Sequence, residues 1–581
     1  MLLTVSLSAA LPLSAASHVD VVKMRTENRV NPLGIGTSTP RFSWQITSDR
    51  KGVVQTSYQI LVASSREKLD RNEADLWDSG ERKSDEQLWI PYQGKALLSG
   101  AQAYWKVRIT TNKGKTEWTE PQLFTIGLLG ETKWSGTWIG LEDLQPGEQK
   151  GMHTRLAARY IRKDFAAKGK VKRAVAYVAG LGVYEFYVNG QRMGGSQALQ
   201  PAPTDYRKTI YYNTFDITSL LTEKNAIAIK LGNGRMFPMR LEKAYKTPFF
   251  GYPKCRINVK VEYENGKTET WATNNTWKLS FDGPIRSNNE YDGEEYDARR
   301  EQALKGWTQA GFDDSQWLKA ERCAIPDGTL MAQPMTGMVE KEFGHPVSLK
   351  HRHDTLIVDF GQNMAGWIGF QVRGRQGDTI RVKYAEKLQA DGSLYLDNFR
   401  NALSEDIYVC NGRENGKSWR PAFSYHGFRY AAITGMKNAR KENFTAYTVS
   451  DEMATIGHIE TSDTILNKVL KNAWWGIYGN YKGMPVDCPQ RNERQPWLGD
   501  RTMGSLGESF VFDNERLYSK WMHDICDAQR SDGNIPDVAP AFWNYYTDDV
   551  TWPAALPFTC DMLYHQFGNK QPIIDSYPSI R

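Results

Sequence analysis

The sequence contains few cysteines and no block of like charge. Its six cysteines lie singly among 581 residues, with neither the paired spacing of a zinc site nor the density of a disulfide framework. We therefore expect free thiols, most of them buried. The 73 basic and 67 acidic residues give a net charge of +6 without a basic cluster, so charge does not indicate nucleic-acid binding or any other partner.

Long apolar runs are also absent after the N-terminus. Residues 2–16 are apolar and end in Ser14-Ala15-Ala16, which is typical of the end of a secretory signal peptide. The run is too short to span a bilayer, and no later stretch predicts a transmembrane helix. No Lys or Arg precedes it, so we expect the true start upstream of Met1. We predict that residues 1–16 are a signal-peptide remnant and that the protein is exported, periplasmic or extracellular, without a membrane anchor.

The length of the chain predicts about four domains at the usual domain size. Residues 18–140 read as a first β-sandwich, because short alternating runs are separated by Gly, Asn and Pro turns. A polar linker over 142–151 precedes a second all-β domain over 152–325, which contains the hairpin signal Asn189-Gly190. A third β-sandwich is predicted over 330–450.

Two charged or glycine-rich stretches in these β domains allow alternative interpretations. Asp292, Glu294, Glu295 and Asp297 could bind calcium, but they lack EF-hand spacing and a charged turn is favoured. Residues 412–418 are one residue short of a phosphate-binding P-loop and have no following helix. We interpret them as a hairpin turn.

The last region, 455–581, is predicted to be helical. Apolar residues recur with i, i+4 spacing over 465–478 and again at Leu517, Trp521 and Ile525. Between these helices, Pro489 and Pro496 disfavour helix. The segment 485–500 is therefore predicted to be a loop that joins two core helices, the kind of position where catalytic groups are often found.

This loop combines carboxylates, arginines and a tryptophan. Glycosidic bond cleavage needs one acid to protonate the leaving oxygen and a second carboxylate to activate water or attack carbon. Glu493 is the predicted acid. Its arginine neighbours favour the ionised form, so this role needs Asp487, Asp500 or burial to favour the protonated form. A salt-bridged loop without catalysis remains the alternative.

The same loop resembles the signature of bacterial α-L-rhamnosidases, glycoside hydrolase family 78: Asp487-Cys488-Pro489-Gln490-Arg491, Glu493-Arg494, Trp497 and Gly499-Asp500 stand in the family order. The resemblance implies that Glu493 is the general acid and that Asp487, Arg491 and Asp500 contact rhamnose or position the acid. Trp497 and Trp552 are the predicted stacking residues. Departures are Asn492 for Asp, Gln495-Pro496 for Leu-Gly, and the lack of an Asp after Trp552, which Asp548 or Asp549 could replace.

The family resemblance also implies an architecture and an activity. It implies a fibronectin-III-like sandwich, a jelly roll that could bind sugar and a further β-sandwich, followed by an incomplete (α/α)6 barrel. A complete barrel needs more than about 200 residues. The implied activity is inverting exo-hydrolysis of terminal α-L-rhamnose from oligosaccharides, polysaccharides or glycosides. No general base is identified, and no cofactor is implied. We expect this chain to be a fragment with little activity; the alternatives are a non-catalytic carbohydrate-binding protein or an (α/α)6 glycosidase for another sugar.

Overall fold

The computed structural model describes residues 19–237, 250–436 and 438–581. The predicted signal segment therefore lies outside the described residues. The chain divides into two compact units, Met1–Ile126 and Gly127–Arg581. Across the described parts of both units, no helix is both long enough and apolar enough to cross a bilayer.

The first unit is a β-sandwich, as predicted. Its core contains Phe42 and Trp105, whose ring centroids are 4.5 Å apart, and the indole nitrogen of Trp105 donates to the hydroxyl of Thr26 at 3.0 Å. One sheet has the order β1 (Val19–Thr26), β2 (Arg41–Ser48), β5 (Ile90–Pro91); the other has the order β4 (Trp77–Asp78), β3 (Gln55–Ala63), β6 (Gln102–Thr111), β7 (Gly114–Lys115), with β8 (Gln122–Thr125) beside β6 and helix α1 at Arg66–Asp70.

The boundary between the first two domains lies near residue 126 and not at residue 140. Strand β9 (Ile139–Gly140) pairs with β16 (Lys254–Tyr263) of the second unit. Trp134 is buried there against Tyr212, with ring centroids 5.2 Å apart. The predicted linker is also part of this fold, because Glu148 forms a buried ion pair with Arg159 (2.5 Å). The boundary lies earlier than predicted because the side chains of Trp134 and Glu148 are buried in the second unit, which the polarity of the local sequence does not indicate.

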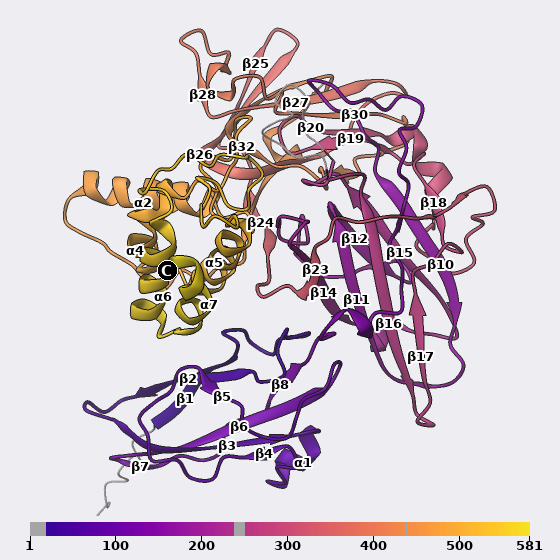
Figure 1. Ribbon diagram of the computed structural model, residues 1–581. Helices are drawn as coiled ribbons and strands as arrows, with labels where there is room; N and C mark the ends of the chain where they lie inside the picture. Colours follow the sequence, from indigo (N-terminus) through magenta and orange to yellow (C-terminus); the bar gives the residue numbers. More distant parts are fainter. Residues whose placement is uncertain (1–18, 238–249, 437) are drawn as a thin grey trace, which may run out of the picture. The chain divides into compact units, whose positions relative to one another are not determined.

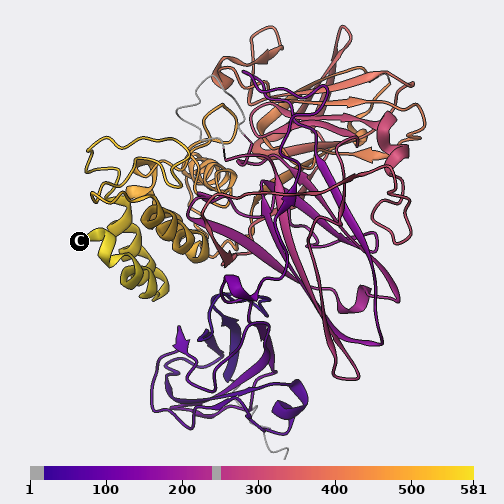
Figure 2. The same ribbon diagram turned by 45° about the vertical axis from the view of Figure 1, so that its right-hand side comes forward.

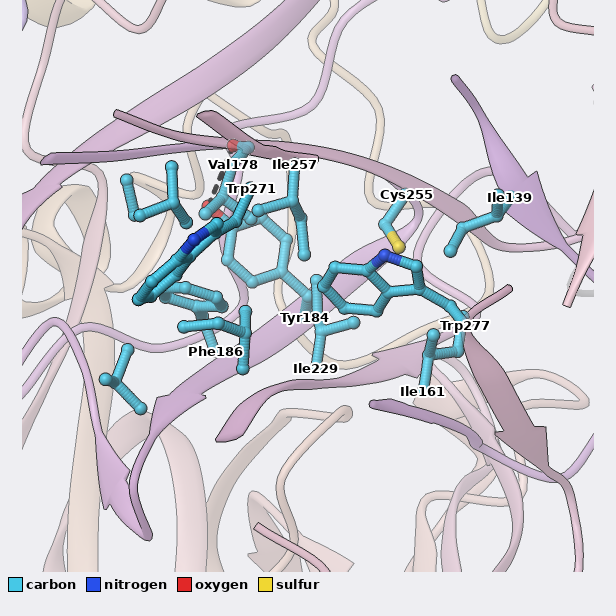
Figure 3. Close-up of a cluster of buried hydrophobic side chains, with 14 of the residues drawn as sticks. Ile139, Ile161, Val178, Tyr184, Phe186, Ile229, Cys255, Ile257, Trp271 and Trp277 are labelled. Carbon is cyan, nitrogen blue, oxygen red and sulfur yellow. Dashed lines mark hydrogen bonds between the residues drawn. The ribbon is translucent and has the colours of Figure 1, made fainter. Parts of the chain in front are cut away.

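The second β-module consists of two sheets that enclose an apolar core. Figure 3 shows side chains from both sheets meeting in this core, among them Ile161 and Ile229 from one sheet and Ile257 from the other. The sheets have the orders β13 (Gln191–Arg192), β12 (Val183–Val188), β15 (Lys224–Gly232), β10 (Arg159–Ala166), β18 (Lys278–Ser280), β21 (Leu318–Lys319), and β22 (Glu321–Arg322), β9, β16, β11 (Val171–Leu181), β14 (Thr209–Asp216), β23 (Thr329–Ala332), with β17 (Thr268–Ala272) beside β16.

The predicted hairpin of this module is confirmed. Asn189 and Gly190 connect β12 to β13 with φ angles of 48° and 87°. Two successive positive φ angles fit the twist of a tight hairpin, which explains the Asn-Gly pair.

The third β-module includes β19 (Ile285–Asn289) and β20 (Gly293–Asp297), which the sequence predicted to be part of the second. β20 runs parallel to β30 (Glu405–Val409), and Tyr296 stacks on Tyr408 with ring centroids 5.3 Å apart. The sheet order is β19, β20, β30, β27 (Thr379–Ala385), β32 (His426–Thr434), β26 (Thr355–Gln371), β33 (Phe444–Asp451), β24 (Met338–Gly344); β25 (Ser348–Arg352) and β31 (Ser418–Trp419) also pair with β26, and β28 (Lys387–Leu388) pairs with β29 (Leu394–Tyr395).

Residues 412–417 form a turn between β30 and β31, as expected, and Ser418 begins β31. These two strands pair with different neighbours, so the predicted hairpin is not formed. The turn projects two basic side chains, Arg413 and Lys417, toward a cleft described below.

The C-terminal region is helical, as predicted, and its helices form one group beside the third β-module in both views (Figures 1 and 2). Helix α2 packs against β26 and β33, and α5, α6 and α7 pack on one another. Gly568 ends α6 in the left-handed conformation (φ 66°). The helices are α2 (Thr464–Gly479), α3 (Gly499–Thr502), α4 (Gly504–Ser509), α5 (Glu515–Ala528), α6 (Ala555–Phe567) and α7 (Gln571–Ile580), and the described 3₁₀ helices are η1 (Glu131–Lys133), η2 (Thr218–Leu220), η3 (Ala298–Leu304), η4 (Asp397–Phe399) and η5 (Lys441–Asn443).

The broad buried face predicted for α2 is wrong over its first half. Ile465 and Val469 are 71% and 56% exposed. The C-terminal half packs as expected, because Tyr478 is buried and Trp474 stacks on it at 4.9 Å. The i, i+4 pattern thus identified the helix, and its tertiary neighbours determined how much of the apolar stripe is covered.

Candidate active site

The segment between α2 and α3 is an irregular loop, as Pro489 and Pro496 predicted. The loop is closed on itself by Asp487 and Gln495: the amide of Asp487 donates to the carbonyl of Gln495 (2.9 Å), and the amide of Gln495 donates to Oδ1 of Asp487 (2.7 Å). This pairing brings Glu493, two residues before Gln495, next to the carboxylate of Asp487.

Arg494 fixes the loop to the β-modules. It is fully buried with φ 51°, and its guanidinium donates to the carbonyls of Arg491 (3.1 Å) and Tyr425 (2.8 Å). It also lies over the Tyr425 ring, 4.6 Å from the centroid. Arg494 therefore anchors the loop through backbone carbonyls. Arg491 is the arginine of the loop that contacts the carboxylates.

Glu493 is buried, and three groups contact its carboxylate. Oε1 accepts from the indole nitrogen of Trp497 (3.1 Å), and Oε2 accepts from Nε of Arg491 (2.9 Å). Arg400 places a guanidinium nitrogen 3.0 Å from the same Oε2. Two guanidinium groups therefore pair with one carboxylate oxygen in this conformation.

Arg491 links Glu493 to Asp487. Its second donor reaches Oδ2 of Asp487 at 3.0 Å. Burial raises the pKa of Asp487, and the charge of Glu493 adds to this effect, while hydrogen bonds from Cys488 and Gln495 and the charge of Arg491 oppose it. The predicted pair of neighbouring carboxylates is thus formed, with Arg491 bridging them.

Asp500 lies in the first turn of α3 and is exposed. It forms no hydrogen bond or ion pair with any residue that the structure describes. Partial desolvation raises the pKa of Asp500, Glu493 raises it further, and Arg501 and Arg491 oppose the rise. An unpaired carboxylate beside a buried ion-pair network is available to a ligand hydroxyl.

The two predicted stacking tryptophans have different surroundings. Trp497 is partly exposed and stacks on Tyr545, with ring centroids 5.6 Å apart. Trp552 packs over Gly499, where an added Cβ would lie only 2.3 Å from the indole. The indole nitrogen of Trp552 is buried and has no hydrogen-bond partner among the described residues. The ring therefore packs against the loop while its N–H donor stays unpaired.

Arg400 and Asn401 are site residues that sequence reasoning missed. They follow η4 in the third β-module, and Asn401 accepts a hydrogen bond from the side chain of Asn492. Glu386 of the same module also lies within the electrostatic reach of Arg491, and burial raises the pKa of Glu386. Nothing in the local pattern around Arg400 indicates contact with a loop about 90 positions later.

Glu508 and Glu515, the nearest downstream glutamates, have structural partners. Glu508 accepts from the hydroxyls of Tyr481 (2.6 Å) and Tyr518 (2.5 Å) and pairs with Arg501 (3.1 Å). Glu515 is fully buried and accepts from Ser519 (2.6 Å). These contacts join neighbouring helices, so we assign neither glutamate as the general base.

One group in the described residues has metal-ligand geometry. Ligand atoms of Asp487, Cys488 and Glu493 lie within 4.8 Å of one another. Arg491 already supplies a positive charge between the two carboxylates, and burial raises the pKa of the Cys488 thiol well above its usual range. The donor set therefore fits an arginine-bridged network better than a cation site.

The carboxylates considered for calcium are bound to separate partners. Asp292 contacts His153 (3.1 Å), Glu295 pairs with Arg155, and Asp297 pairs with Arg299 (2.8 Å). Glu294 accepts from the backbone amides of Ala422 and Phe423 (3.1 and 3.0 Å). Since neighbouring residues on β20 point to opposite faces, the four do not converge.

Comparison with known proteins identifies the class to which this fold and loop belong. Family profiles match a Rha78A-like N-terminal immunoglobulin domain at residues 21–130 and an alpha-L-rhamnosidase N-terminal domain at 169–342. They also match a bacterial alpha-L-rhamnosidase concanavalin-like domain at 349–450 and a bacterial alpha-L-rhamnosidase 6 hairpin glycosidase domain at 454–581. The chain is thus a multidomain protein with Ig-like and β-sandwich domains before a helical glycosidase region.

Individual relatives narrow this class to one family. The chain is 32% identical to an alpha-L-rhamnosidase of Alteromonas sp. and 34% identical to one of Formosa agariphila, over 96% and 97% of this chain. A solved alpha-L-rhamnosidase from Dictyoglumus thermophilum superposes with a TM-score of 0.90 at 34% identity, covering 96% of this chain and 63% of that one. The Streptomyces avermitilis enzyme complexed with L-rhamnose gives 0.88 at 25% identity, covering 97% and 70%. The chain therefore consists largely of bacterial alpha-L-rhamnosidase domains.

The chain spans 60% and 63% of the lengths of the Alteromonas and Formosa relatives. The matches therefore concern the β-modules and the part of the helical domain that contains the 485–500 loop.

Proposed function

We propose that the protein acts on terminal α-L-rhamnose, releasing it from oligosaccharides, polysaccharides or glycosides with inversion at the anomeric carbon. The observation that carries this proposal is the buried carboxylate of Glu493, held between Trp497 and Arg491 and next to Asp487. In this proposal Glu493 donates a proton to the leaving oxygen, and a second carboxylate, which we do not assign, activates water. No cofactor takes part.

Substrate recognition is assigned to the groups around Glu493. Asp487, Arg491 and the unpaired Asp500 offer acceptors and donors for sugar hydroxyls, and Trp497 offers an aromatic face. Trp552 contributes its unpartnered indole nitrogen. The solved structure of the Streptomyces avermitilis relative complexed with L-rhamnose supports rhamnose as the sugar.

The proton-donor role requires Glu493 to lose one of its two cations. Arg400 is the partner that a ligand can displace, because its side chain is 54% exposed whereas that of Arg491 is 31% exposed and bound to two carboxylates. Displacement of Arg400 by the leaving group would open Oε2 of Glu493 to the departing oxygen.

The test compares Glu493→Gln with the unaltered chain on an aryl α-L-rhamnoside. A positioned general acid contributes roughly 10²- to 10⁴-fold to rate, so release of the phenol should fall by this factor while L-rhamnose still binds. Glu460→Gln, an exposed glutamate before α2, is the matched control. Measurable turnover at equal rates in Glu493→Gln and the unaltered chain would rule out Glu493 as the acid.

A second candidate, a carbohydrate-binding protein without catalysis, is favoured by the double ion pair on Glu493. For such a protein, we expect the chain to bind rhamnose, Trp497→Ala to lose this binding, and neither to turn over the aryl rhamnoside. The third candidate is a related glycosidase for another sugar, which the departures from the family pattern at Asn492 and after Trp552 suggest. Assays with fucosides, glucosides and arabinosides in place of the aryl rhamnoside test it.

Export to the periplasm or the exterior is proposed from residues 2–16, whose apolar run ends in small residues. N-terminal sequencing of the protein from the culture medium or the periplasm tests it. Recovery only from the cytoplasm with Met1 retained would contradict export.

A further inference from the structure

A second cleft lies between the second and third β-modules. One lobe has a volume of about 780 Å³ and an adjoining lobe about 560 Å³, and both are lined by Tyr187, Lys230, Tyr296 and Lys417. All residues that line the lobes fall between Tyr160 and Tyr447, so the helical region contributes none of them. A volume of this size accommodates a short oligosaccharide. The cleft is therefore separate from the Glu493 site.

The larger lobe is strongly basic, with a single acid, Glu301, in its lining. Lys417 pairs with this acid (2.8 Å), and Lys230 and Arg299 pair with acids outside the lobe. Lys305 and Arg413 also line it and form no ion pair with any described residue. Two uncompensated cations in one cleft attract an anionic ligand.

The rest of the lining suits a sugar. Tyr187 and Trp307 meet edge to face, with ring centroids 5.7 Å apart, and Tyr296 lies in the wall shared by the lobes. Such rings offer flat apolar faces beside polar edges. Side-chain amides of Gln376 and Asn411 supply both donors and acceptors for hydroxyl groups.

The smaller lobe contains a buried polar atom without a partner. Glu294 is 1% exposed, and its Oε1 has no hydrogen-bond partner in the described part of the chain. Burial raises the pKa of Glu294 to about 8, so its carboxyl is mainly protonated at neutral pH. A neutral carboxyl lining a cleft can bind a hydroxyl both as donor and as acceptor.

We propose that this cleft is a second carbohydrate-binding site, and that its ligand is an acidic oligosaccharide whose anionic groups contact Lys305 and Arg413. The sugar rings lie against the aromatic wall, and hydroxyl groups reach the amides and Glu294. The site does not depend on the rhamnosidase proposal, because no residue is shared between the two.

Titration calorimetry of the full chain tests the site with three probes: a tetragalacturonate, which carries carboxylates, a sulfated carrageenan oligosaccharide, and neutral maltotetraose. We expect one or both acidic probes to bind, and Lys305→Ala/Arg413→Ala to weaken that binding by roughly tenfold or more, as for loss of charge-assisted contacts. Arg322→Ala/Lys350→Ala, which removes two exposed cations outside the cleft, should bind like the unaltered chain. Glu493→Gln should also bind unchanged.

Several outcomes would overturn the proposal. Absence of binding by both acidic probes, or equal loss in the cleft variant and the control variant, would refute the site. Binding that is lost in Glu493→Gln and kept in Lys305→Ala/Arg413→Ala would place the ligand in the rhamnose site. Inorganic sulfate binding as tightly as the oligosaccharides would show an ion site without sugar contacts.

Discussion

Replacing Arg494 by methionine should release the 485–500 loop. Its guanidinium donates to the carbonyls of Gln490 (3.2 Å), Arg491 (3.1 Å), Tyr425 (2.8 Å) and Glu290. Methionine fills much of the volume and donates to none of them. Each buried acceptor left without a donor costs roughly 1–3 kcal/mol.

We therefore expect Arg494→Met to lower the free energy of unfolding of the second unit by about 4 kcal/mol, at the lower limit of about 1 kcal/mol for each of the four carbonyls. Thermal and urea unfolding followed by near-UV circular dichroism measure the change. Limited trypsin digestion should show new cleavage at Arg491 in the loop or at Arg501 in α3. Arg494→Lys keeps the charge and some donors and should lie between the two.

Arg429→Met is the matched control, because Arg429 forms a partly exposed ion pair with Asp359 (2.8 Å) and such pairs contribute about 0–1 kcal/mol. If Arg494→Met destabilises no more than this control, the guanidinium does not hold the loop.

Three further predictions concern other parts of the chain. Burial raises the pKa of Glu294 to about 8. The stabilising contribution of this group is complete below about pH 4.5 and is lost as pH rises through about 8. Glu294→Gln should therefore flatten the pH dependence of the unfolding free energy across this window, by up to about 5 kcal/mol, and a pH profile parallel to that of the unaltered chain would contradict this. Gly499→Ala should displace Trp552, since the new Cβ would lie 2.3 Å from the indole, and cost about 1–3 kcal/mol, measured by urea unfolding; an unchanged midpoint would contradict it. Chelator treatment should leave the thermal midpoint unchanged, because Asp292, Glu295 and Asp297 bind other partners; a lower midpoint restored by calcium would show a metal site.

Local sequence determined the elements and the identity of the loop. Alternation and turn residues identified the strands of the first unit, and Asn189-Gly190 identified a hairpin whose two positive φ angles the structure shows. Pro489 and Pro496 identified the loop because they exclude helix through sterics that act over one or two residues. The six free thiols were also expected from their isolated spacing; five are buried, and Cys526 is partly exposed.

Tertiary structure decided which distant segments meet. Arg400 reaches Glu493, and β20 joins β30 of the third β-module, although neither pairing has a local signature. Such contacts depend on strand register and on how the modules pack. The same reason explains the domain boundary at Ile126, the exposed first half of α2 and the double ion pair on Glu493. The sequence by itself determined which residues are available for chemistry, and the tertiary fold determined the charges around them, because electrostatic interactions depend on distances between segments far apart in the chain.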